Sequence, residues 1–232
     1  MTMTTKIPDD DAELFALIRN ELFTAVVGDV LDAAELTRQF LPPEIHPLQP
    51  DMIVVGRAMT VLEADCFGDE VRARKSREPF GLMFRALDDL KPNEIYLCTG
   101  SSFDYALWGE LMSTRAMHCG AAGAVVDGFS RDTRGILRLE FPVFSRGAYA
   151  QDQRVRGRVI DFRCPLVFPN GVRVNSGDVL FGDRDGVLVI PAEHLHATVS
   201  AALEKARGEN QVAAAIRNGM SAQAAWDQFG IM

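Results

Sequence analysis

Two stretches of the sequence decide the expected fold: Gly109-Glu110-Leu111-Met112 and, further along, Gly123-Ala-Val-Val-Asp-Gly-Phe-Ser-Arg131-Asp132. The first is typical of a helix start, and the second of a strand that runs into a loop. Twenty residues separate Glu110 from Arg131, about the length of one helix plus one strand. After one helix and one strand, the chain should return to the edge of the fold where the helix starts. Glu110, Arg131 and Asp132 are therefore expected to face one pocket.

Helical and strand-like segments alternate on both sides of these stretches. The sequence predicts helices at 12–20, 24–32, 82–90, 110–119 and from 132, and strands at 53–56, 58–62, 94–99, 124–127 and 142–145. Thr24 is a candidate N-cap of the second helix, and Gly56-Arg57 is expected to separate the first two strands. This alternation indicates an α/β core.

The pattern changes after residue 158. Close-spaced strands are predicted at 159–162, 166–168, 172–174, 179–181 and 187–190, with glycine-containing turns between most of them. Such dense turns predict a second, antiparallel sheet, with Asp183-Arg-Asp-Gly186 as a hairpin turn. Helix is predicted after Pro191 with a break at Gly219, and the polar stretch 63–80 receives no assignment.

We expect an N-terminal helical segment (1–23), an α/β core (24–191) and a C-terminal helical extension (192–232). A chain of 232 residues with 47% hydrophobic residues can bury a sizeable core.

The charge and composition exclude several classes of function. A formal net charge of −8 argues against binding to nucleic acid or to an anionic membrane. No apolar run reaches transmembrane length, and no glycine-rich nucleotide-binding loop is present. The four cysteines are scattered without a CxxC pair, and no signal peptide is evident. These features predict a cytoplasmic protein with reduced cysteines.

The loop after the 124–127 strand carries the candidate chemistry. An exposed Asp132 can supply a hard oxygen ligand to Mg²⁺ or Mn²⁺, although it could equally cap the helix that follows. Arg131 suits an anion clamp or the stabilisation of enolate charge, or it could be a solvated loop residue. A carboxylate pair beside a guanidinium predicts metal-assisted chemistry on a small oxo acid.

The start of the 110–119 helix has a complementary role. Its free backbone N–H groups attract a carboxylate, while Glu110 alone could be only a favourable first-turn acid. Three other aspartates are interpreted as structural, through turn or cap bonds: Asp29, Asp32 and Asp127. The four histidines lack zinc-site spacing.

These residues resemble those of a known family. The matching segments are Trp108-Gly-Glu-Leu-Met112, Gly120 to Asp132, Phe141-Pro-Val-Phe144 and Gly177-Asp-Val-Leu-Phe-Gly-Asp-Arg-Asp-Gly-Val-Leu-Val-Ile-Pro191. They look like the RraA-like family, which includes class II 4-hydroxy-4-methyl-2-oxoglutarate and 4-carboxy-4-hydroxy-2-oxoadipate aldolases. The resemblance implies a swivelling β/β/α fold, in homotrimers or homohexamers with sites between subunits.

The resemblance also implies roles for individual residues. Asp132 would bind the divalent cation directly, and Glu110 would bind it through water. Arg131 would contact the pyruvyl group of the substrate, and Gly109 and the amides of Leu111 and Met112 would surround its carboxylate. A glutamate from a neighbouring subunit would join the metal waters, and two candidates fit its place in the chain: Glu209, the better match, and Glu204.

The implied reaction is metal-dependent cleavage of a 4-hydroxy-2-oxo acid to pyruvate and an oxo acid, with oxaloacetate decarboxylation as a side activity. No lysine lies in the expected site, which fits a metal-dependent route rather than a Schiff base. Two alternatives remain. Regulators of ribonuclease activity in this family bind a protein and are shorter, without the C-terminal extension. The chain could also act on a different oxo acid, with Arg72, Arg74, Lys75 and Arg77 either reading a distal carboxylate or forming a solvated or intersubunit face.

Overall fold

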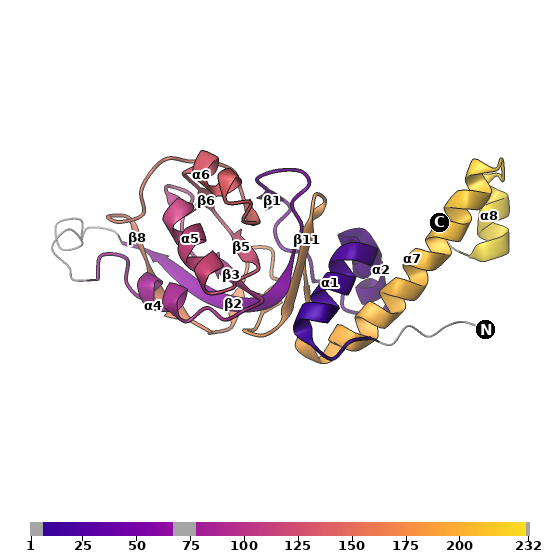
Figure 1. The fold of residues 1–232 in the computed structure, drawn as a ribbon, viewed down its shortest axis with the longest axis horizontal. Helices are drawn as coiled ribbons and strands as arrows, with labels where there is room; N and C mark the ends of the chain where they lie inside the picture. The colour runs from indigo at the N-terminus through magenta and orange to yellow at the C-terminus, as the bar shows by residue number, and fades with distance from the viewer. Residues whose placement is uncertain (1–6, 67–77, 231–232) are drawn as a thin grey trace.

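A curled, mixed sheet organises the part of the chain that the computed structural model describes, residues 7–66 and 78–230 (Figure 1). Eight strands pair in the order β1-β7-β5-β3-β2-β11-β12, with β8 on β2. Strand β1 also contacts β11 and β12, so the two ends of the sheet approach each other and nearly close it. The strands are β1 His46–Pro47, β2 Val54–Asp65, β3 Glu94–Thr99, β5 Gly123–Val126, β7 Val143–Ser145, β8 Gly157–Phe162, β11 Val179–Asp183 and β12 Gly186–Ile190.

The strands β2, β3, β5 and β7 are parallel neighbours, as expected for an α/β core. The prediction of a separate antiparallel sheet is wrong for most of its strands. β8, β11 and β12 join the main sheet as antiparallel members, and β9 (Leu166–Val167) pairs with β10 (Arg173–Val174) outside it. This is possible because β2 pairs with β11 along its first half and with β8 along its second half.

The predicted break at Gly56-Arg57 is also wrong, because β2 continues through it. Gly56 lies in the strand at a point where the backbone of the segment before β3 comes close. A Cβ atom on Gly56 would stand 2.5 Å from the carbonyl oxygen of Asn93. The glycine therefore permits a close backbone approach instead of ending the strand. The predicted hairpin turn at 183–186 is confirmed by the pairing of Asp183 with Gly186.

The predicted helices are present with small shifts of their ends. They are α1 Asp11–Glu21, α2 Thr24–Ala33, α4 Met83–Asp88, α5 Glu110–His118, α6 Thr133–Arg138, α7 Leu195–Arg217 and α8 Ala222–Phe229, with a short 3-10 turn at Ala192–His194. Thr24 is the first helical residue of α2 and not its N-cap, which is Phe23. The backbone N–H and the hydroxyl of Thr24 donate to the carboxylate of Asp183 at 2.8 and 2.7 Å. The hairpin thus supplies the cap that Phe23 lacks.

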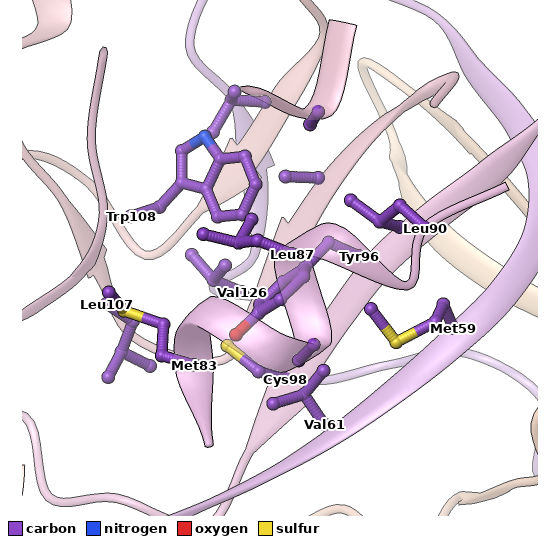
Figure 2. Packing of buried hydrophobic residues seen from close by; sticks show 14 of the residues in the cluster. Met59, Val61, Met83, Leu87, Leu90, Tyr96, Cys98, Leu107, Trp108 and Val126 are labelled. Atoms are coloured by element: carbon purple, nitrogen blue, oxygen red, sulfur yellow. The ribbon is translucent and has the colours of Figure 1, made fainter. Parts of the chain in front are cut away.

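Among the described residues, buried hydrophobic side chains gather in three clusters. One lies inside the curled sheet, one lies under α1, α2 and α7, and one lies between the sheet and α4, α5 and α6. The last cluster contains Met83, Leu107 and Trp108, which Figure 2 shows beside the sheet residues Tyr96 and Cys98. Met59 and Val61 of β2 both point into it because side chains two residues apart lie on the same face of a strand. This cluster forms the floor of the candidate site.

The C-terminal helices lie at the opposite end of the molecule from α5 and α6 (Figure 1). The N-terminal half of α7 packs on α1 and α2, and its far half extends away from the core with α8 beside it. Gly219, with φ of 97°, separates these two helices as predicted. None of the helices in the described ranges is long and apolar enough to cross a membrane.

Candidate active site

A small parallel strand pair brings the two diagnostic stretches together. β4 (Ala106–Trp108) pairs with β6 (Phe129–Ser130), and the backbone N–H of Arg131 donates to the Trp108 carbonyl at 2.8 Å. Parallel strands end at the same edge, so Gly109 and Arg131 emerge side by side. The sequence predicted this juxtaposition but not these two short strands, which are too brief to show periodicity.

Arg131 lies between two aspartates at this edge. Its Nη1 is 3.0 Å from Asp152 Oδ1, and its Nε is 3.8 Å from Asp132 Oδ2. All three side chains are partly exposed, at 37% for Arg131, 48% for Asp132 and 38% for Asp152. One guanidinium between two carboxylates leaves the group with a net negative charge that a cation could balance.

Asp132 precedes α6 in the left-handed conformation, with φ of 58° and ψ of 30°. It occupies the N-cap position, but its side chain makes no capping hydrogen bond. Aspartate tolerates this conformation better than most residues, and such backbone positions are found at functional sites. The geometry therefore does not support the alternative that Asp132 serves only as a helix cap.

Gly109 allows the Asp132 carboxylate to lie against the start of α5. A Cβ atom at Gly109 would stand 2.8 Å from Asp132 Oδ2 and 3.5 Å from Arg131 Cγ. The backbone of Gly109 is extended, so glycine is required here by space and not by φ. The first intrahelical bond of α5 runs from Ser113 N to Gly109 O. The N–H groups before Ser113 therefore have no partner within the helix and can receive an anion.

Glu110 is not among the described residues that line the cavity discussed below. Its carboxylate packs on Gly135 of α6, where a Cβ atom would stand 2.1 Å from Glu110 Oε2. Gly135 is buried, and its missing side chain makes the space that Glu110 occupies. The structure thus places Glu110 beside the helix that follows Asp132, while Gly109, Leu111 and Met112 face the cavity with Arg131 and Asp132.

The cavity next to Asp132 has a volume of about 450 Å³. Its polar wall contains Arg131, Asp132, Asp152 and Gln153, and a second rim contains the ion pair of Arg115 with Asp88 at 2.8 Å. The remaining wall is largely hydrophobic, and it consists of Phe80, Met83, Phe84, Leu87, Ala106, Leu107, Trp108, Leu111 and Met112.

Asp152 and Gln153 were not predicted as site residues. They lie in the irregular connection between β7 and β8, where the sequence shows no periodicity or known motif. Gln153 is 3% exposed, and its Nε2 donates to Glu63 Oε2 at 2.7 Å. Glu63 anchors this connection from β2.

Glu63 is a buried acid next to the site, at 1% exposure. Burial raises its pKa to about 8, against a smaller lowering by the Gln153 hydrogen bond. Its Oε1 has no hydrogen-bond partner among the described residues. The raised pKa favours the neutral form of Glu63 at pH 7.

The expected partner glutamates lie away from this site within one chain. Glu209 belongs to α7 and pairs with Lys205 at 2.9 Å, and Lys205 also pairs with Asp29 at 3.2 Å. Figure 1 shows α7 at the opposite end of the molecule from α5 and α6. Glu209 or Glu204 can thus serve this site only from another copy of the chain, which stays a prediction.

The chain matches known proteins along most of its length. The sequence profile of the RraA-like family, described as Aldolase/RraA, matches residues 24–189. This chain belongs to the RraA-like family. A "Putative 4-hydroxy-4-methyl-2-oxoglutarate aldolase" of Halalkalibacterium halodurans is 32% identical over 72% of each protein. Protein DlpA of Legionella pneumophila is 29% identical over 89% of this chain, which spans only 32% of DlpA.

Solved structures confirm the RraA-like fold. A structure described as novel cellulases from microbes associated with the gut ecosystem is 30% identical, with a TM-score of 0.76 over 90% of both chains. Streptomyces coelicolor RraAS2, described as an unusual member of the RNase ES inhibitor RraA protein family, is 21% identical, with a TM-score of 0.74 over 88% of this chain and 96% of its own. The latter likeness concerns the fold alone.

The oxygen donors of this RraA-like chain fit a hard divalent cation that keeps several waters. Asp132 presents a partly exposed carboxylate without a capping bond. No group of three or more metal-binding side chains occurs within residues 7–66 and 78–230, so a closed zinc-type site is not formed there. Mg²⁺ and Mn²⁺ need few protein carboxylates, and the donor set suits them.

Proposed function

We propose that this protein is a divalent-metal-dependent aldolase that cleaves 4-hydroxy-2-oxo acids to pyruvate and a second oxo acid. The observation that carries this proposal is the meeting of Asp132, Arg131 and the free amides of α5 at the end of the β4–β6 pair. Family membership and the aldolase relatives support the same class of lyase. Oxaloacetate decarboxylation would accompany the aldolase reaction, because both reactions pass through pyruvate enolate.

Asp132 would bind Mg²⁺ or Mn²⁺ directly, and Glu110 would bind it through water. The bound cation would supply Lewis-acid stabilisation of negative charge on the 2-oxo acid. The amides of Leu111 and Met112 would receive the substrate carboxylate, since the helix N-terminus favours an anion. Gly109 would keep this approach open by leaving no side chain in front of Asp132.

Water at the site would take the C4 hydroxyl proton as the C3–C4 bond breaks. The C4 oxygen then becomes a carbonyl, and the electron pair of the broken bond remains on C3 as pyruvate enolate. Arg131 would stabilise the enolate oxygen, with Asp152 fixing the direction of the guanidinium. Protonation of C3 completes pyruvate, and the neutral Glu63 would hold the 152–153 connection through Gln153.

The test is pyruvate release from oxaloacetate and from 4-carboxy-4-hydroxy-2-oxoadipate by the purified chain. Mg²⁺ or Mn²⁺ should support turnover, EDTA should abolish it, and Asp132→Asn should reduce kcat by roughly 10³-fold or more. Asp32→Asn, at an exposed acid in α2, is the matched control and should keep full activity. A folded protein without metal-dependent turnover of either compound would contradict the proposal and favour a protein-binding regulator.

We also propose that the active assembly is a homotrimer or homohexamer in which Glu209 of one copy approaches Asp132 of the next. Glu209→Gln should lower kcat at least about tenfold, whereas Glu204→Gln should not. Light scattering of both variants separates a catalytic effect from loss of the assembly. If Glu204→Gln lowers kcat and Glu209→Gln does not, the role belongs to Glu204.

A further inference from the structure

We infer that the substrate carries an apolar group, alkyl or aryl, beyond the bond that is cleaved, rather than a further carboxylate. This inference rests on the proposed function and narrows its substrate class. It follows from the division of the cavity into a polar edge and a hydrophobic wall.

The hydrophobic wall comes chiefly from α4 and β4. Met83, Leu87 and Leu107 are buried, at 6%, 4% and 1% exposure, and Phe84 forms the rim at 54%. Figure 2 shows Met83 beside Leu107, and both belong with Leu87 to one cluster of buried hydrophobic residues. Removing an alkyl or aryl group from water against this surface is favourable.

The layout separates this wall from the reacting end. α5 contacts both α4 and α6, and Figure 1 shows it between them. Asp132 and Gly109 lie at the α6 side, while Met83, Phe84 and Leu87 belong to α4. A cavity of about 450 Å³ has room for more than a pyruvyl unit. A substrate held at Asp132 would therefore extend along α5 toward α4.

The described part of the cavity wall offers a second carboxylate no unpaired cation. Both arginines in the described wall are already paired, Arg131 with Asp152 at 3.0 Å and Arg115 with Asp88 at 2.8 Å. A carboxylate that enters the hydrophobic part would lose its hydration without gaining an unpaired cation from the residues that the structure describes there, which is costly.

Binding measurements with a matched pair of ligands test the inference. 2-Oxopentanoate and 2-oxoglutarate share the same 2-oxo acid end and differ in a terminal methyl or carboxylate group. With Mg²⁺ present, calorimetry should give a Kd roughly tenfold lower for 2-oxopentanoate, and 2-oxohexanoate should bind at least as tightly. Equal or tighter binding of 2-oxoglutarate would overturn the inference.

Two arginine substitutions sharpen the test. Phe84→Arg places an unpaired cation on the wall and should reduce the preference for 2-oxopentanoate by severalfold. Val167→Arg, at a 58% exposed position in β9, adds the same charge away from the cavity and should leave the preference unchanged. If 2-oxoglutarate binds more tightly to the unchanged protein and Arg115→Met removes that advantage, Arg115 recognises the second carboxylate and the inference is wrong.

Oxaloacetate decarboxylation separates this inference from the proposed function, because the leaving group is the C4 carboxylate itself and oxaloacetate has no chain that could reach the α4 wall. Turnover of oxaloacetate without a preference for the apolar ligand leaves the enzyme class intact and refutes the substrate class. An apolar preference in binding without any turnover supports the pocket and refutes the aldolase. Loss of both binding and turnover refutes both.

Discussion

Asp127 and Asp132 follow the same strand, β5, yet they have opposite environments. Asp127 is 2% exposed and accepts hydrogen bonds from Thr99 Oγ1 at 2.6 Å and from Arg146 Nε at 2.8 Å. The Asp132 side chain is 48% exposed, and its nearest cationic nitrogen, on Arg131, is 3.8 Å away. An acid whose bonding capacity is used within the fold contributes to structure, whereas an incompletely paired acid at a cavity can bind a ligand.

The first prediction measures this difference as stability. Asp127→Ala should lower the free energy of unfolding by about 3–5 kcal/mol, because it leaves the largely buried Arg146 with only Glu44, at 3.3 Å, as an ionic partner. Asp132→Ala should change it by less than about 0.5 kcal/mol, since the side chain is exposed and uncapped. Urea unfolding of both variants tests the comparison, and equal losses would show that Asp132 is also structural.

A second prediction concerns Glu63, the buried acid behind the site. Its pKa is about 8 in the folded chain against an ordinary value of 4.5, so the folded state keeps a proton that the unfolded chain releases. Stability from this group is full below about pH 4.5 and is lost as the pH rises toward 8. Relative to Glu63→Gln, the unchanged protein should lose a few kcal/mol over this range. If the unchanged protein and Glu63→Gln show the same dependence of stability on pH from 5 to 8, burial does not raise the pKa of Glu63 as stated.

A third prediction concerns the space in front of Asp132. Gly109→Ala should lower oxaloacetate turnover by roughly 10- to 100-fold, because its Cβ would force the Asp132 carboxylate to move. Gly177→Ala is the control for a glycine without neighbours within 4 Å, and it should affect stability through its positive φ but not turnover at saturating substrate. Unchanged turnover in Gly109→Ala would show that the position of Asp132 is not critical.

The smallest expected effect concerns Asp152, the partner of Arg131. Both side chains are more than a third exposed, so the ion pair contributes at most about 1 kcal/mol. Asp152→Asn should raise the KM for oxaloacetate by up to about fivefold without changing the unfolding midpoint. A loss of kcat as large as that of Asp132→Asn would give Asp152 a direct role in the reaction.

The sequence predicted the parallel core, the helices and the close approach of the two diagnostic stretches, because regular periodicity and glycine-bounded strands are local signals. Its interpretation of Asp127 as structural is confirmed, although the bonds come from Thr99 and Arg146 and not from a turn or cap. The sequence failed at β2, where Gly56 serves a close packing contact, and at β8, β11 and β12, which join the main sheet. These outcomes depend on partners distant in the chain.

Arg72, Arg74, Lys75 and Arg77 lie outside the described residues, so their predicted roles are unchanged. The roles of Glu209 and Glu204 and the assembly depend on contacts between copies. They remain predictions that the Glu209→Gln and Glu204→Gln variants test.

By itself, the sequence determined the family, the α/β class and the spacing of Glu110, Arg131 and Asp132, since these follow from residue types at fixed intervals. Only the tertiary structure decided that Asp132 faces Gly109, that Asp152 pairs with Arg131, and that burial raises the pKa of Glu63. It also placed the hydrophobic wall of α4 along the same cavity. The physical reason is that hydrogen-bond partners and burial depend on segments that are distant in the sequence and come into contact only in the folded sheet. A local sequence pattern does not predict such contacts.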